Sequence, residues 1–121
     1  HEFDIDHKNT DSYIHRNAGS SQIIVSSSKR WVKIVELNNS RELKLDDLID
    51  QLSETDVVIV EGFKNDNHPK IEIIKTGNNN YLFNNISNIK AIISEEEIDT
   101  DLKQFKKNEI DNIVNFILKE I

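Results

Sequence analysis

Glu61, Gly62 and Lys64 are the residues of this chain best suited to chemistry, because they directly follow its most apolar run, Val-Val-Ile-Val at residues 57–60. An unbroken run of β-branched aliphatics is typical of a strand buried on both faces in a parallel sheet. Ligands of open α/β sheets bind just beyond the carboxyl ends of such strands. The pattern therefore predicts that Glu61 is a functional acid, although a solvated glutamate at the end of a strand would show the same pattern.

Gly62 and Lys64 each have a functional and an ordinary interpretation. Because Gly62 has no Cβ, it would let the backbone turn close to a phosphate, and it would equally suit a common turn at the end of a strand. The Lys64 ammonium group would reach a phosphate or the substrate of a partner, or it would be a solvated surface group. The residue types alone leave both alternatives open.

The segment 11–18, predicted as a short helix, is a second candidate site. Helical spacing puts Ser12, His15 and Arg16 on neighbouring positions. The Arg16 guanidinium could clamp a phosphate with two parallel hydrogen bonds. The alternative is a helix capped by Asp11, with a surface salt bridge from Arg16. We favour a functional role, and more strongly for Arg16 than for His15.

Other charged groups give weaker signals. Asp6 could be a second acid near a metal ion, but an aspartate in an N-terminal loop is more often simply solvated. His1, Glu2 and His7 lie in a polar segment without a third ligand at helical spacing, which disfavours a transition-metal site. The acidic run at residues 95–97 is most simply a solvated loop.

Alternating helices and strands must position these residues. The predicted strands cover residues 22–26 and 30–37, joined as a hairpin, then 57–60, 70–75 and 89–94, with a short edge strand at 102–105. The predicted helices cover residues 11–18, capped by Thr10 or Asp11 and ended by Gly19, then 45–52, and 110–121, capped by Asn108 with Asp111 in a variant capping box. This alternation predicts an α/β fold with a mixed, mostly parallel sheet, flanking helices and a β-hairpin.

Composition narrows the class of protein. The chain has 121 residues, which predicts a single domain, and a formal net charge of -7, which argues against nucleic acid or an anionic membrane as the main partner. It has no cysteine, which excludes disulfides, thiolate chemistry and cysteine-based zinc sites. No apolar run approaches the roughly 20 residues that span a bilayer, so we expect a soluble cytoplasmic protein. It also lacks methionine and opens with His1, so we expect a piece of a longer protein.

Several short motifs, in their order and spacing, resemble the molybdopterin-guanine dinucleotide biosynthesis protein B family (MobB). The motifs are Phe-Asp-Ile-Asp at residues 3–6, Asp-Ser-Tyr-Ile-His-Arg-Asn-Ala-Gly at 11–19, Arg-Trp at 30–31, Val-Glu-Gly-Phe-Lys at 60–64, and Pro-Lys-Ile-Glu at 69–72. The resemblance covers most of the chain, and the C-terminal third matches mainly in pattern.

The resemblance implies a P-loop nucleotide-binding fold, commonly dimeric, that binds GTP and has weak GTPase activity at most. Such proteins assist the molybdopterin guanylyltransferase, which attaches GMP to molybdopterin. It further implies Mg²⁺ beside Glu61 and Asp6, since Mg²⁺ takes one or two carboxylates plus phosphate oxygens. The positions implied to lie near the nucleotide are Asp11, Ser12, Arg16, Gly62 and Lys64.

The chain departs from the family in one respect: the phosphate-binding motif G-x-x-x-x-G-K-[ST] does not occur in it. We therefore expect residues 1–121 to be one incomplete domain that lacks its first β-α-β unit, and we expect this piece to bind GTP poorly. The lost first strand would pair beside residues 57–60, so its absence would expose an apolar edge that invites aggregation unless a partner covers it.

Two other functions stay open at this point. A dethiobiotin-synthetase-like P-loop enzyme also carries Val-Glu-Gly after a buried strand, but it usually continues with small residues, whereas this chain continues with Phe63 and Lys64. A non-catalytic binding module without a nucleotide site is the second alternative, and it would be indifferent to GTP and Mg²⁺.

Overall fold

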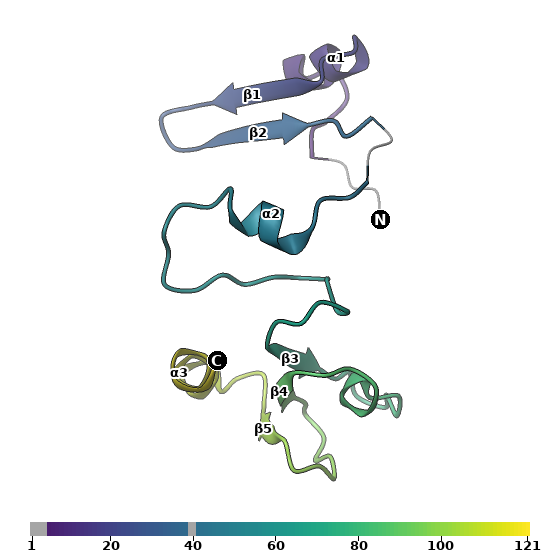
Figure 1. Ribbon diagram of the computed structural model, residues 1–121, viewed down its shortest axis with the longest axis vertical. Helices are drawn as coiled ribbons and strands as arrows, with labels where there is room; N and C mark the ends of the chain where they lie inside the picture. The colour runs from purple at the N-terminus through teal and green to yellow at the C-terminus, as the bar shows by residue number, and fades with distance from the viewer. Residues whose placement is uncertain (1–4, 39–40) are drawn as a thin grey trace. The chain divides into compact units, whose positions relative to one another are not determined.

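The structure is a computed structural model that describes residues 5–38 and 41–121 (Figure 1). Its residues form two compact units, His1–Lys44 and Leu45–Ile121, and each is described by itself. That these units belong to one incomplete domain stays a prediction. Among the described residues, no helix is long and apolar enough to cross a membrane.

The first unit begins with α1 (Asp11–Asn17), whose two ends are closed as the sequence predicts. Thr10 is the N-cap, and its side-chain oxygen accepts a hydrogen bond from the Tyr13 amide at 3.4 Å. Gly19, with φ of 97°, donates to the Arg16 carbonyl, and Ser20 donates to the His15 carbonyl. These two bonds form the Schellman motif, in which a left-handed residue after the helix satisfies its last carbonyls.

A β-hairpin of β1 (Gln22–Ser26) and β2 (Trp31–Val35) completes the first unit. The strands are antiparallel and pair Ile23 with Ile34 and Ser26 with Trp31. Ile23 is buried, at 8% exposure, and lies on the strand that contacts α1. The opposite face of the hairpin is open to solvent, because Trp31 is 68% exposed. The predicted hairpin is therefore confirmed, with one packed face and one exposed face.

The second unit contains α2 (Leu45–Ile49) and a three-stranded parallel sheet. The sheet has the order β3 (Lys70–Ile73), β4 (Ile89–Ile93) and β5 (Lys103–Phe105), with the short 3-10 helix η1 (Leu82–Asn84) between the first two strands. The last element is α3 (Ile110–Glu120), which lies beside the sheet in Figure 1. These elements confirm the predicted α/β class.

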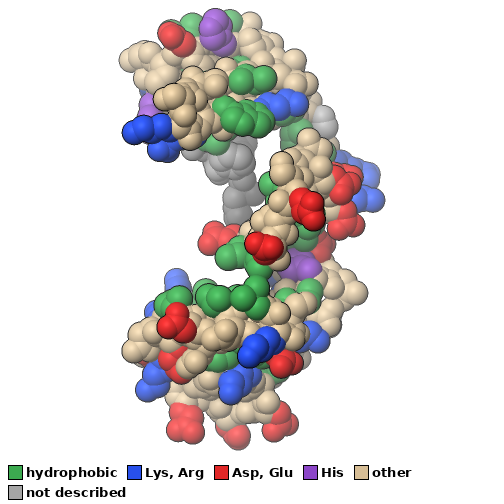
Figure 2. Space-filling view, turned by 90° about the vertical axis from the view of Figure 1, so that its left-hand side faces the viewer, with side chains coloured by type: hydrophobic (Ala, Val, Ile, Leu, Met, Phe, Trp, Pro, Cys, Tyr) green, Lys and Arg blue, Asp and Glu red, His purple; other side chains and the backbone are tan. Residues whose placement is uncertain are grey.

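The core of the second unit lies in and beside the central strand. Ala91 and Ile92 of β4 are fully buried, and Ile74 is 1% exposed. α3 reaches this core through the Phe116 ring, which meets the buried Phe105 ring edge to face, with centroids 5.5 Å apart. Other apolar side chains of α3 are exposed, among them Ile110, Val114 and Leu118. Figure 2 shows apolar side chains at the surface of both units.

Four sequence predictions differ from the structure. Residues 57–60 form no strand, and Ile59 is 83% exposed, because no strand among the described residues pairs with this segment. The helix predicted over 45–52 ends at Ile49. Asn108 is not the N-cap of α3: Glu109 is, and its carboxylate accepts the Lys106 amide instead of capping the helix. The Asp111 capping box is therefore wrong as well.

Candidate functional site

In the first unit, the structure brings two predicted site residues into direct contact. Arg16, in the last turn of α1, donates from Nη2 to Asp6 Oδ1 at 2.6 Å. The Asp6 side chain is 5% exposed and the Arg16 side chain 23%. Asp6 is therefore not the solvated loop aspartate that residue type alone favoured, because the pairing lets the charge be buried. Ten residues separate the partners, so the contact ties the segment before α1 to the helix.

Arg16 has two further neighbours, one on α1 itself and one just beyond β2. Its guanidinium carbon lies 5.5 Å from the centroid of the Tyr13 ring, a cation–π contact within α1. Its Nε lies 3.8 Å from Glu36 Oε1, just beyond β2, which is an ion pair without a hydrogen bond. Arg16 thus sits between two carboxylates and an aromatic face, an arrangement that fixes the direction of the planar guanidinium.

This cluster keeps some hydrogen-bonding capacity unused. Asp6 Oδ2 and Arg16 Nε are both buried, and neither has a hydrogen-bond partner among the described residues. Buried polar atoms of this kind are rare in native structures and need an explanation. The unused acceptor could take a water or a cation, and the unused donor could take a water or an anionic oxygen.

The other candidates on α1 are more exposed. Asp11 lies in the first turn and is exposed, where its charge suits the positive end of the helix. Ser12 Oγ lies 3.1 Å from Thr10 Oγ1, so this hydroxyl is part of the cap. His15 is exposed in the last turn. Only Arg16, among the predicted residues of this helix, is held by other elements.

In the second unit, the predicted residues 61–64 form an exposed turn. The backbone is left-handed at two successive residues, Gly62 with φ of 89° and Phe63 with φ of 47°. A hydrogen bond from the Asp66 amide to the Phe63 carbonyl at 3.0 Å closes the next turn, over residues 63–66. Glu61 and Lys64 are exposed, and their side chains make no hydrogen bond or ion pair with another described residue. Both charges are available to a ligand.

Two polar residues that sequence reasoning missed hold this region together. Lys70, at the start of β3, donates from Nζ to the carbonyls of Asp66 and His68, which anchors the loop that follows residue 64. Glu72 is 6% exposed and accepts the amides of Leu82 and Phe83 at 2.7 and 3.0 Å. The sequence did contain a signal for Glu72, because it is an acid between two isoleucines of a predicted strand.

The residues described fit a hydrated Mg²⁺ better than a metal held by protein ligands alone. In the ranges 5–38 and 41–121, no three side chains of histidine, aspartate or glutamate converge on one point. Mg²⁺ needs no such cluster, since it commonly binds through one or two carboxylates, waters and substrate phosphates. Each unit by itself offers one carboxylate for that purpose: Glu61 in the second unit is unpaired among the described residues, and Asp6 in the first unit has the unpartnered Oδ2.

A parallel sheet together with helices places the chain in the class of α/β proteins, and comparison with known proteins narrows the class. The chain matches the family described as "Molybdopterin guanine dinucleotide synthesis protein B" over residues 1–95. It therefore belongs to this family, MobB, whose members have a P-loop nucleotide-binding fold.

Two relatives agree with the family match. One is the molybdopterin-guanine dinucleotide biosynthesis adapter protein of Escherichia coli, 28% identical over 98% of this chain and 70% of the relative. The other is the protein of the same name in Haemophilus influenzae, 30% identical over 97% of this chain and 66% of the relative. The chain thus spans about two thirds of the length of these relatives.

Proposed function

We propose that this chain acts as an adapter in the synthesis of molybdopterin guanine dinucleotide, and that it binds GTP with Mg²⁺. Its partner would be the molybdopterin guanylyltransferase, and molybdopterin would be the molecule to which GMP is attached. Membership of the family and the names of the two relatives support this role. The family match also disfavours a dethiobiotin-synthetase-like enzyme.

The observation that carries the proposal is the exposed turn at residues 61–64. Glu61 and Lys64 project opposite charges, neither of which is used by another described residue. Glu61 would hold a hydrated Mg²⁺ directly or through a water, and Lys64 would contact a phosphate. A Cβ placed on Gly62 would meet no atom within 4 Å, so the space on this side of the turn is open.

The cluster on the first unit would have a positioning role. Asp6 fixes the Arg16 guanidinium through Oδ1, and its Oδ2 would be available to a hydrated Mg²⁺. Arg16 would direct its remaining N–H groups at a phosphate, as planar guanidinium groups commonly do. Asp11 and Ser12 would contribute from the first turn of α1, where the helix dipole is positive, although the nucleotide must compete there with the Thr10 cap.

The phosphate cradle must come from a P-loop. No G-x-x-x-x-G-K-[ST] motif occurs in the 121 residues, and both relatives are longer than this chain. The proposal therefore concerns a protein that includes such a unit. Any GTP hydrolysis in it would depend on Mg²⁺ electrostatics and positioning rather than on a nucleophile from this chain.

A homodimer is part of the same proposal. The open face of the hairpin carries Ile24 at 66% exposure, Trp31 at 68% and Val35 at 46%. These apolar side chains share the face with their polar cross-strand partners, and exposed apolar groups of this kind commonly mark an interface with another protein. Sedimentation analysis of Trp31→Glu against the unchanged protein tests it, because a charge in this face should shift the population toward monomer.

Substitution of Glu61 by glutamine in the protein with its P-loop tests the nucleotide site. Isothermal titration in the presence of Mg²⁺ should show GTP affinity reduced by about tenfold, since a neutral amide attracts a divalent cation much less than a carboxylate does. Because Glu61 is exposed and unpaired, the free energy of unfolding should change by less than about 0.5 kcal/mol.

Glu97→Gln is the matched control, because it removes the same charge from an exposed loop of the same unit. It should leave GTP affinity unchanged with and without Mg²⁺. Equal GTP affinity for the Glu61→Gln protein and its parent would show that Glu61 has no role at the nucleotide.

A further inference from the structure

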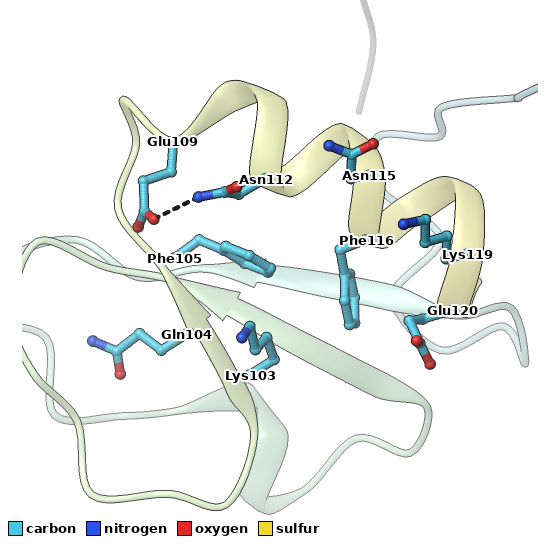
Figure 3. A pocket seen from close by; sticks show the side chains of 9 residues that line it. All are labelled: Lys103, Gln104, Phe105, Glu109, Asn112, Asn115, Phe116, Lys119 and Glu120. Atoms are coloured by element: carbon cyan, nitrogen blue, oxygen red, sulfur yellow. Dashed lines mark hydrogen bonds between the residues drawn. The ribbon is translucent and has the colours of Figure 1, made fainter.

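Two regions of the second unit, both outside the turn at residues 61–64, differ in how their polar groups are used. A pocket of about 350 Å³ between β5 and α3 is lined in part by two lysines and two glutamates (Figure 3), so its charges balance and select no ligand. The loop at residues 65–69, by contrast, is hydrogen-bonded to the starts of β3 and β4. This loop directly follows the turn, so its bonds bear on where the turn is held.

Lys70 and Asn88 make the bonds between this loop and the sheet. Lys70, the first residue of β3, donates from Nζ to the Asp66 carbonyl and, at 2.8 Å, to the His68 carbonyl. Asn88, immediately before β4, donates from Nδ2 to the Asn67 carbonyl at 3.1 Å and to Asn67 Oδ1 at 2.5 Å. The Lys70 amide donates to the Asn88 carbonyl at 2.8 Å, which joins the two residues to each other. Three successive carbonyls of the loop are therefore fixed to the sheet.

The turn at residues 61–64 is coupled to this loop through Asp66. Its amide donates to the Phe63 carbonyl at 3.0 Å, and its carbonyl accepts the Lys70 ammonium group. Within the described residues, the bond between Asp66 and Phe63 is the only main-chain hydrogen bond of the segment 61–66. A path of two hydrogen bonds thus runs from the first residue of β3 to the residue that follows Gly62.

The residue types at positions 70 and 88 suit this task. The Lys70 ammonium group carries a full charge, which makes its bonds to carbonyls stronger than those of a neutral donor. Asn88 has φ of 64°, and asparagine tolerates this left-handed backbone better than most residues. Both side chains belong to residues that are only partly exposed, unlike Lys90 of β4. The two residues are therefore built into the unit rather than solvated on its surface.

We propose that Lys70 and Asn88 are positioning residues for Glu61. Lys70 holds the Asp66 peptide, Asn88 holds the loop that contains it, and together they keep the Glu61 carboxylate oriented for a hydrated Mg²⁺. This inference rests on the proposed nucleotide site and extends it to two residues that do not touch the ligand. Groups that support a metal ligand from behind commonly raise affinity, because they reduce the cost of ordering that ligand on binding.

Hydrogen exchange of the Asp66 amide, in the protein with its P-loop and without nucleotide, tests the positioning directly. Lys70→Met keeps the aliphatic stem and removes the ammonium group, so this amide should exchange at least about threefold faster. Asn88→Gly removes the bonds to Asn67 from a backbone that glycine adopts readily, and it should give a smaller increase. Lys90→Met, at an exposed lysine of the same unit, is the matched control and should change nothing.

Isothermal titration with GTP tests the consequence for the ligand. Lys70→Met should weaken GTP binding by about fivefold with Mg²⁺ and by less than about twofold without it, because only the metal contact depends on Glu61. Adding Lys70→Met to Glu61→Gln should weaken binding no further, because the two substitutions remove the same contact. A purely structural role for Lys70 would instead lower GTP affinity equally with and without Mg²⁺.

Circular dichroism confirms that each variant is folded, and Asn88→Gly carries the test if Lys70→Met does not fold. Unchanged exchange of the Asp66 amide in both variants, or losses of GTP affinity that are equal with and without Mg²⁺, would overturn the inference. A loss of GTP affinity in Glu61→Gln but not in Lys70→Met would overturn this inference alone. Equal GTP affinity for Glu61→Gln and its parent would overturn the proposed nucleotide site as well.

Discussion

Two candidate residues of the first unit, Asp6 and Arg16, are paired with each other, whereas the charged candidates of the second unit are open to solvent. Asp6 and Arg16 form a buried ion pair at 2.6 Å, and both also retain an unpartnered atom. Glu61 and Lys64 are exposed on a turn and pair with no described residue. An acidic and a basic side chain thus have different energetic roles in the two units.

This difference in pairing predicts which substitutions change the stability of the fold and which change ligand binding. A buried ion pair adds little to the free energy of folding compared with an apolar pair. Removal of one partner is nevertheless destabilising, because it leaves the other charge in a poorly solvated place. An exposed unpaired charge contributes almost nothing to folding, so its replacement reports on ligands alone. Substitutions in the first unit should therefore change stability first, and substitutions at residues 61–64 should change binding first.

Asp6→Ala should have the largest effect, because it leaves the Arg16 guanidinium without its main partner. We expect the free energy of unfolding to fall by about 3 kcal/mol. This value is at the lower end for buried ion pairs, because Arg16 keeps some solvent access. Hydrogen exchange of the amides of α1 and the hairpin measures the loss in this unit. Asp11→Ala, an exposed acid on α1, is the control and should cost far less. Equal exchange rates in both variants would contradict the buried role of Asp6.

Glu72→Ala should destabilise the second unit by about 2 kcal/mol, because it leaves the Leu82 and Phe83 amides without their charged acceptor. Glu72→Gln keeps one acceptor oxygen and should lose about half as much. Urea unfolding followed by circular dichroism measures both. If the two variants were equally stable, the negative charge of the carboxylate would not be what holds η1.

Gly62→Ala should cost about 1 kcal/mol, since an L-residue is strained at φ of 89°. No atom lies within 4 Å of the added Cβ, so crowding adds nothing to this figure. Gly77→Ala is the matched control, with φ of 76° and equally open surroundings. The two variants should unfold alike in urea, but only Gly62→Ala should reduce GTP affinity in the protein with its P-loop. Equal GTP affinity for both would remove the turn from the site.

The smallest effect concerns Glu109, whose pKa is lowered from 4.5 mainly by the Lys106 amide. Because the folded pKa is below the unfolded one, the stabilisation is complete above about pH 4.5 and is lost as pH falls toward the lowered folded pKa. Urea unfolding between pH 6 and pH 3 should show a slightly shallower pH dependence for Glu109→Gln than for its parent. Identical profiles would contradict the contribution of this bond.

Local signals in the sequence predicted most of the elements. Thr10 and Gly19 bound α1 as expected, because capping and left-handed termination involve neighbours within one turn. The hairpin and the strands near residues 70–75 and 89–94 followed from short apolar patterns. Residues 57–60 have the same kind of pattern but no strand, because a strand also requires a neighbour that pairs with it.

The sequence by itself therefore determined the α/β class, the family and the order of the elements, since these depend on residue types and on neighbours close in the chain. Only the tertiary structure decided which charges are used: it pairs Arg16 with Asp6 across ten residues, gives Glu72 to two amides of η1, and leaves Glu61 exposed. The physical reason is that burial and pairing arise from contacts between distant segments, and composition and spacing carry no record of those contacts.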